Sequence, residues 1–262
     1  MSKLASFGVR LRDLLLYRKE KLKWTFWTIR YRHDIEELYR HMAPTYDVVF
    51  DGNVTSKRYN AFFEAFMRNL NIKDAVVLDA GTGTGLLAER LAPLARRVIG
   101  IDVSSDQLQV LKQQHKGPRN LAAVHASIEA IPLADQSCDV AVTCGTMGMV
   151  AFAYFDEELG IAEMARTLKV GGEIGVWFKV CLSRPHPWLR RLAQRIGWQL
   201  YDIDSLRQTF ERYGLKMTGL GELENQRIRY RGKLYLGVKV AHCTPHLETS
   251  PQQPPALAET LR

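Results

Sequence analysis

One stretch, VVLDAGTGTGLLAERLA from Val76 to Ala92, constrains the fold more than any other part of this 262-residue sequence. An apolar run ends at Asp79, glycines follow at Gly81, Gly83 and Gly85, and a helical pattern begins at once. Glycine permits a tight turn and a close approach to a ligand where a Cβ atom would collide. The stretch therefore predicts a strand, a ligand-binding loop and a helix, which together begin an α/β unit.

Short apolar runs alternate with helical patterns through residues 73–242, which predicts a parallel sheet covered on both faces. Two final β-rich runs, Leu215–Leu223 and Lys233–Ala241, are joined by a segment too short for a crossover helix. They therefore form a hairpin whose last strand runs antiparallel to its neighbours. The other expected strands are Ala75–Asp79, Arg97–Ile101, Leu121–Val124, Asp139–Thr143 and Gly172–Val180, and the expected helices are Leu86–Leu94, Ser105–His115, Asp156–Leu168 and Ile203–Tyr213.

A second acid, Asp102, ends the next predicted strand, at the spacing of about 20 residues that nucleotide-binding folds use. A carboxylate there can accept hydrogen bonds from both ribose hydroxyls of a nucleoside. The loop reads G-x-G-x-G and not the dinucleotide form G-x-G-x-x-G. Asp79 would also repel a pyrophosphate, whereas it would attract the ammonium group of a methionine moiety. The pattern therefore favours S-adenosylmethionine (SAM) over NAD.

Four segments, LDAGTGTG, IDVS, SIEAIPLADQSCDV and RTLKVGGEI, resemble the class I SAM-dependent methyltransferases over residues of about 40–242. The element LYRHMAPTYDVVFDG is similar to one in the ubiquinone/menaquinone-biosynthesis methyltransferases and the related bacterial phospholipid N-methyltransferases. The resemblance implies an α/β, Rossmann-like, seven-stranded sheet of order 3-2-1-4-5-7-6 with strand 7 antiparallel. It also implies SAM as the cofactor and methyl transfer as the reaction.

The same resemblance implies roles for individual residues. Tyr46 and Asp47 are the candidate catalytic residues, because the family element places them near the methyl group. Asp102 would hold the ribose, and Ser127 would flank the adenine at a position where the family usually has Asp or Asn. That departure predicts a weaker contact with the adenine amino group. The implied cofactor-binding residues are Tyr46, Asp79, Gly81, Gly83, Thr84, Gly85, Asp102, Val103, Ser127, Ile128 and Cys144.

Methyl transfer from a sulfonium is an in-line displacement in which positioning supplies much of the catalysis. The sequence offers no convincing general base, and His186 is only a weak candidate. No cysteine pair or cluster predicts a metal site. The small, apolar segment after the fourth predicted strand is either core or the wall of an acceptor pocket, through Met147, Met149, Phe152, Tyr154 and Phe155.

The first 33 residues carry nine Lys and Arg against two acids, a net charge of +7 in a chain whose total is +8. As a helix over residues 3–29, this segment would place most of its apolar side chains on one face. Trp24 and Trp27 are typical of residues at a lipid headgroup boundary. The segment is therefore interpreted either as an anchor to an anionic membrane or as a lid over the active site, with a nucleic-acid-binding arm and a mitochondrial presequence the less favoured alternatives.

No apolar run approaches the roughly 20 residues of a membrane span, and the start lacks the pattern of a secretory signal. The four cysteines are too dispersed for a disulfide framework. These features predict a cytoplasmic protein, peripheral on the inner face of a membrane if the N-terminal segment binds lipid. The expected domains are a basic helical segment (1–40), a methyltransferase domain (41–243) and a disordered tail (244–262).

The expected acceptor is a small, lipid-soluble molecule, either a quinone precursor or a phospholipid amine. A methyltransferase for soluble small molecules or natural products, with the N-terminal segment as its lid, is the first alternative. An RNA-associated methyltransferase is the second.

Overall fold

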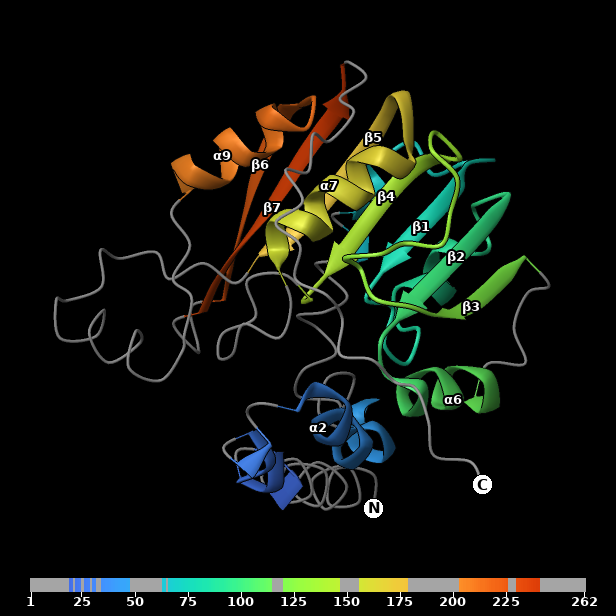
Figure 1. Ribbon diagram of the computed structural model, residues 1–262, viewed down its shortest axis with the longest axis vertical. Helices are drawn as coiled ribbons and strands as arrows, with labels where there is room; N and C mark the ends of the chain where they lie inside the picture. Colours follow the sequence, from blue (N-terminus) through green and yellow to red (C-terminus); the bar gives the residue numbers. More distant parts are fainter. Residues whose placement is uncertain are drawn as a thin grey trace, which may run out of the picture.

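A seven-stranded sheet in the order β3-β2-β1-β4-β5-β7-β6 forms the centre of the protein in the computed structural model (Figure 1). Pairing is parallel from β3 to β5, and β7 runs antiparallel to both β5 and β6. The predicted strand order and antiparallel last strand are confirmed. The strands are β1 (Val76–Ala80), β2 (Arg97–Asp102), β3 (Leu121–His125), β4 (Cys138–Cys144), β5 (Leu168–Phe178), β6 (Leu215–Asn225) and β7 (Tyr230–Lys239).

The structure describes residues 19–20, 22–24, 26–28, 30–31, 34–47, 63–64, 66–114, 120–146, 156–178, 203–225 and 230–240. The predicted acceptor wall at 147–155, His186 and the C-terminal tail lie outside these residues. Within them, no helix is both long enough and apolar enough to cross a membrane.

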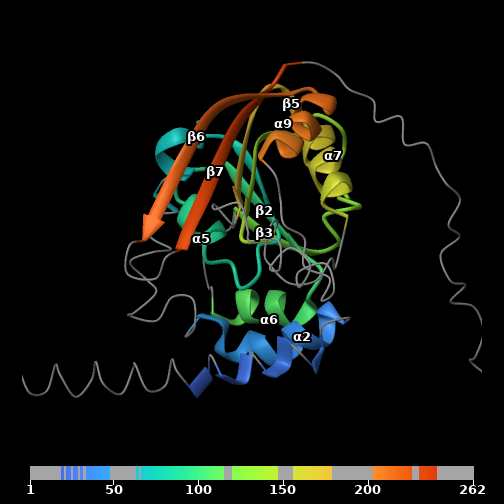
Figure 2. The same cartoon turned by 90° about the vertical axis from the view of Figure 1, so that its left-hand side faces the viewer.

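Helices cover both faces of the sheet and its carboxyl edge. α7 and α9 lie on one face, and α5 lies on the other (Figure 2). α2 and α6 contact each other beyond the carboxyl ends of the parallel strands, as both views show. The helices are α2 (Ile35–Met42), the 3₁₀ helix η1 (Ala43–Thr45), α5 (Ala88–Leu91), α6 (Ser105–Gln114), α7 (Glu157–Thr167) and α9 (Ile203–Arg212).

Successive side chains of β1 build two separate cores, because they point to opposite faces of the sheet. Leu78 packs in the cluster that contains Ile161 and Met164 of α7. Val77 packs in the other cluster, with Phe66 and with Leu91 of α5. The strand is therefore apolar at nearly every position, as expected for a parallel strand buried on both faces.

Several predicted boundaries were wrong, and β7, expected from Lys233, begins at Tyr230. The helix expected at Leu86–Leu94 is limited to Ala88–Leu91, since turns occupy the residues after the glycines and Pro93 has no amide hydrogen to continue a helix. The strand expected to begin at Gly172 begins at Leu168, which pairs with Cys138. A register shift between Cys138 and Val140 accommodates this longer strand.

The N-terminal helix, described at residues 19, 20, 22–24, 26–28 and 30, packs with α2 and η1 below the carboxyl edge of the sheet (Figure 2). Trp24 is buried in one cluster with Leu38 and Met42 of α2. Asp34 begins α2, and its carboxylate accepts a hydrogen bond from the Glu37 amide at 2.9 Å. We call the described residues between 19 and 47 the N-terminal cap.

Candidate cofactor site

The glycine loop between β1 and α5 adopts backbone conformations that favour glycine. Gly81, Gly83 and Gly85 have φ angles of +77°, +57° and +89°. A Cβ atom on Gly81 would lie 1.9 Å from Oγ1 of Thr146, and one on Gly85 would lie 2.2 Å from Cδ1 of Leu111. Two of the glycines are therefore required by packing as well as by the turn, whereas the backbone conformation alone favours glycine at Gly83.

Asp102, at the end of β2, holds the glycine loop and the start of α6. Its Oδ2 accepts a hydrogen bond from the Gly83 amide at 2.8 Å, and its Oδ1 accepts one from the Ser104 amide at 2.9 Å. Burial raises the pKa of Asp102, and these two hydrogen bonds oppose the rise. A carboxylate has about four acceptor sites, so Asp102 can still accept the hydroxyls of a ribose while the backbone fixes it.

Asp79, at the end of β1, is 1% exposed. The Thr82 hydroxyl donates to its Oδ2 at 2.8 Å. Burial raises the pKa of Asp79 to about 7, the Thr82 hydrogen bond opposes the rise, and the negative charge of Asp102 adds to it. A carboxyl group that ionises near neutral pH suits a site that takes up a positive charge, such as an ammonium group.

The residues expected around the adenine follow β2 and β3 at the same edge of the sheet. The Ala126 amide donates to the Asp102 carbonyl at 3.0 Å, which brings the chain at Ser127 and Ile128 close to that acid. Ile128 is buried, and the Ser127 hydroxyl donates to Oε2 of Glu129 at 3.1 Å. The carbonyl of Val103 lies 2.7 Å from Nε2 of His125.

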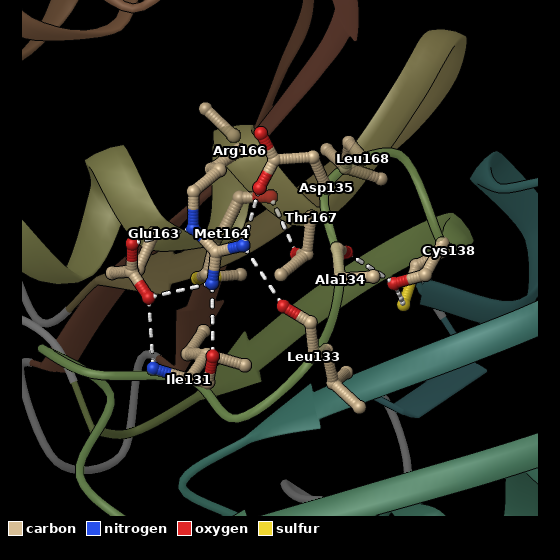
Figure 3. A network of polar contacts seen from close by, with 12 residues as sticks. Ile131, Leu133, Ala134, Asp135, Cys138, Glu163, Met164, Arg166, Thr167 and Leu168 are labelled. Atoms are coloured by element: carbon tan, nitrogen blue, oxygen red, sulfur yellow. Dashed lines mark hydrogen bonds and ion pairs between the residues drawn. The ribbon is translucent and has the colours of Figure 1, made fainter. Parts of the chain in front are cut away.

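Arg166 of α7 fixes the loop that continues from Ile128 towards β4 (Figure 3). Its guanidinium donates to the carbonyls of Ile131 and Leu133, each at 2.8 Å, and to Oδ1 of Asp135 at 2.6 Å. Glu163 pairs with Arg166 at 2.7 Å and also accepts the Ile131 amide at 2.8 Å. The loop that follows Ser127 and Ile128, the residues expected around the adenine, is therefore held in place by α7, a helix on the face of the sheet.

Cys144 ends β4 and is partly buried at the same edge. Burial raises the pKa of its thiol strongly, and the charge of Asp79 adds to the rise. The thiol therefore stays protonated at neutral pH and is a poor nucleophile. The role expected of Cys144, beside the cofactor, requires only that its side chain pack there.

Asp47 of the N-terminal cap reaches the glycine loop, and its neighbour Tyr46 packs within the cap. The Thr84 hydroxyl donates to Oδ1 of Asp47 at 2.6 Å, which joins residues 37 positions apart. The Tyr46 ring lies 5.4 Å from the ring of Trp24, and the Trp24 indole donates to Oγ1 of Thr45 at 3.2 Å. The structure thus brings Asp47 to the glycine loop and packs Tyr46 against Trp24, and the catalytic role of both residues stays a prediction.

Sequence reasoning missed three residues that shape this site: Thr82, Ser104 and Thr146. The Thr82 hydroxyl donates to Asp79, whereas Ser104 donates to Asp102 through its backbone amide and accepts the Gln107 amide with its hydroxyl. Thr146 donates to the Ala80 and Gly81 carbonyls at 3.4 and 3.3 Å from more than 60 positions away. The first two could have been found as hydroxyl residues next to the predicted strand ends. The third has no local signal.

Among the residues that the structure describes, no group of three or more His, Cys, Asp or Glu side chains could hold a metal ion. The site instead gathers one buried acid, one acid held by backbone amides and a glycine loop at the carboxyl edge of a parallel sheet. That edge is where open α/β sheets bind nucleotides.

Comparison with known families agrees with the resemblance to methyltransferases seen in the sequence. Residues 77–172 match a family of methyltransferase domains, and this range contains the glycine loop, Asp102 and the two residues expected around the adenine, Ser127 and Ile128. The chain contains a class I SAM-dependent methyltransferase domain. The cofactor of this methyltransferase domain is SAM.

The match between this chain and its relatives covers only part of the length of each relative. The chain is 33% identical to an uncharacterized methyltransferase of Mycobacterium tuberculosis over 121 residues, 46% of each protein. It is 29% identical to a ubiquinone/menaquinone biosynthesis C-methyltransferase of Syntrophotalea carbinolica over 146 residues, 54% of this chain and 59% of that one. In both cases the matched stretch spans less than two thirds of the relative.

Solved structures share the fold. A geranyl diphosphate C-methyltransferase from Streptomyces coelicolor, bound to S-adenosyl-L-homocysteine, superposes with a TM-score of 0.59 at 14% identity. The superposition covers 71% of this chain and 80% of that one.

Proposed function

We propose that this protein is an enzyme that transfers the methyl group of SAM to a small, lipid-soluble acceptor at a membrane surface. The observation that carries the catalytic part is the joining of three elements at one edge: the glycine loop, Asp102 and Asp47 of the N-terminal cap. The Gly83 amide donates to Asp102, the expected ribose ligand, and the Thr84 hydroxyl donates to Asp47, the candidate acceptor-site acid. Both acids are therefore held around the same turn.

The chain's contribution to the reaction is positional. SAM supplies an activated methyl group when it is bound. Asp102 orients the ribose, Asp79 attracts the ammonium group, and the aromatic ring of Tyr46 offers a surface beside the sulfonium. Aligned reactants recover roughly 7–11 kcal/mol of the barrier without a strong base, and Asp47 is held in place by Thr84 to orient an acceptor.

The acceptor class is inferred from the relatives and from the N-terminal cap. One relative is a ubiquinone/menaquinone biosynthesis C-methyltransferase, and a structural neighbour methylates the isoprenoid geranyl diphosphate. The first name points to a hydrophobic quinone acceptor, and the second to an isoprenoid chain that carries a charged diphosphate, so a quinone precursor is our first choice and a phospholipid amine our second.

The outer face of the N-terminal helix supports contact with a membrane. Leu22 and Phe26 are 74% and 61% exposed. Lys19, Lys23 and Arg30 are also exposed and fall on the same side at helical spacing. Each cation near an anionic bilayer contributes about 1 kcal/mol, so this mixed basic and apolar face fits a lipid surface better than solvent.

The membrane part is tested by sedimentation with vesicles of phosphatidylglycerol and phosphatidylcholine. We expect Leu22→Ser/Phe26→Ser to lose vesicle binding while it binds SAM like wild type. A control, Leu94→Ser/Val170→Ser, removes two exposed apolar residues, 46% and 50% exposed, from the methyltransferase domain and should keep both properties. Wild-type binding should weaken as salt screens the basic side chains.

Equal sedimentation of the outer-face variant and wild type would contradict the membrane part alone. Binding to RNA in a gel shift without binding to vesicles would favour the RNA-associated alternative. Transfer of labelled methyl from SAM to a component of a lipid extract tests the acceptor class directly, and label found only in water-soluble products would contradict it.

The inner face of the same helix supports the second candidate, a methyltransferase for soluble acceptors with a lid. Trp24 is buried, and the His41 ring stacks 5.4 Å from Trp27 and 4.8 Å from Tyr31. These contacts hold the helix against α2, and the chain that follows α2 reaches the glycine loop through the hydrogen bond between Asp47 and Thr84. A lid needs only this inner face, whereas a membrane anchor also needs the outer one.

A further inference from the structure

Gln107, in the first turn of α6, has a buried side-chain amide that the fold does not use. The residue is 1% exposed, and among the described residues neither its Oε1 nor its Nε2 has a hydrogen-bond partner. The start of the helix does not need this amide, because the Gln107 backbone amide already donates to the Ser104 hydroxyl at 3.3 Å.

A buried amide without a partner destabilises a protein, since it loses its hydrogen bonds to water and gains none. Leucine or methionine would fill the same space on a helix without that loss. An amide in such a place therefore indicates a ligand with polar atoms of its own.

The surroundings of Gln107 identify the ligand. Its Oε1 lies 3.7 Å from the point that a Cβ atom on Gly83 would occupy. The Gly83 amide donates to Asp102 at 2.8 Å, and Asp102 is the expected ribose ligand. The unused amide thus faces the part of the glycine loop that Asp102 fixes, and not the interior of the core.

We propose that Gln107 binds the nucleoside half of SAM through its side-chain amide. The amide offers two N–H donors and one carbonyl acceptor, which complement the hydroxyls of a ribose or the amino group and ring nitrogens of an adenine. Gln107 would thereby supplement Ser127, whose hydroxyl is already bonded to Glu129. The inference rests on the proposed SAM site and adds a binding residue to it.

Calorimetry with two probes tests the inference: S-adenosylhomocysteine, and 5′-methylthioadenosine, which lacks the amino-acid part. We expect Gln107→Met to weaken the binding of both probes about 5- to 20-fold, in line with one or two lost hydrogen bonds. The melting temperature of the cofactor-free variant should equal or exceed that of wild type. Gln109→Met is the matched control, because Gln109 is exposed on the same helix, and it should change neither property.

Unchanged affinity of Gln107→Met for both probes would overturn the inference. So would a loss confined to S-adenosylhomocysteine, since the amide would then serve the amino-acid half. Gln107→Leu removes the same amide with a different shape, and if neither variant folds, the amide is structural and the inference is wrong. A wild-type protein that binds neither probe would instead remove the cofactor site itself.

Discussion

At the scale of single residues, Asp79 links the site to pH. Its pKa of about 7 lies above the value of 3.8 for an ordinary Asp, so the folded protein keeps a proton that the unfolded chain loses. This group therefore destabilises the cofactor-free protein increasingly as pH rises from about 4 to about 7. An ammonium group beside Asp79 would favour its ionised form, so we expect SAM affinity to rise up to tenfold per pH unit between about pH 5.5 and about pH 7, with release of a proton.

Calorimetry in buffers of different ionisation enthalpy measures that proton release. The matched variant, Asp79→Asn, should bind SAM more weakly, show a flatter pH profile and melt at a higher temperature without cofactor at neutral pH. Affinity of the wild type that does not change over this range would place the ammonium group away from Asp79.

At the scale of elements, Arg166 joins α7 to the loop that follows Ser127 and Ile128, the residues expected around the adenine. Its side chain is 20% exposed and bonds two carboxylates and two carbonyls. Removing one partner of such a network leaves the others without their hydrogen bonds. We expect Arg166→Ala to lower the free energy of unfolding by about 2–4 kcal/mol in urea denaturation, and to weaken SAM binding.

Arg68→Ala is the control for this element. Arg68 also pairs with a carboxylate, Glu64 at 3.0 Å, but its side chain is 77% exposed, so its loss should leave the unfolding transition nearly unchanged. Equal effects of the two substitutions would show that Arg166 acts only as a surface ion pair.

At the scale of the whole molecule, the N-terminal cap connects an exposed basic and apolar helix face, the proposed lipid-binding surface, to the glycine loop. Trp24 packs on α2 and bonds Thr45, and two residues later Asp47 bonds Thr84. Deleting residues 1–33 should therefore lower stability by about 3 kcal/mol or more, the typical cost of losing a buried aromatic side chain, and should weaken SAM binding. Thermal melts and calorimetry measure both effects.

The outer-face variant Leu22→Ser/Phe26→Ser is the comparison for this deletion, because it leaves Trp24 in place. It should lose vesicle binding only. A truncated protein with wild-type SAM affinity would mean that the N-terminal helix serves the membrane and not the cofactor site.

The sequence by itself determined the features that depend on neighbouring residues. The glycine loop was predictable because three closely spaced glycines suit backbone angles that other residues seldom adopt. Asp79 and Asp102 were predictable because apolar runs mark the strands and acids mark their ends. The hairpin of β6 and β7 was predictable from the shortness of its connection, since a parallel crossover needs more chain.

Only the tertiary structure decided the contacts between distant residues. Nothing local pairs Asp47 with Thr84, places Thr146 against Gly81, or starts β5 opposite Cys138. The burial of Gln107 likewise depends on how α6 lies against the glycine loop. The physical reason is that backbone angles and periodicity are set within a few residues, whereas a side chain's partners are set by the packing of elements far apart in the chain.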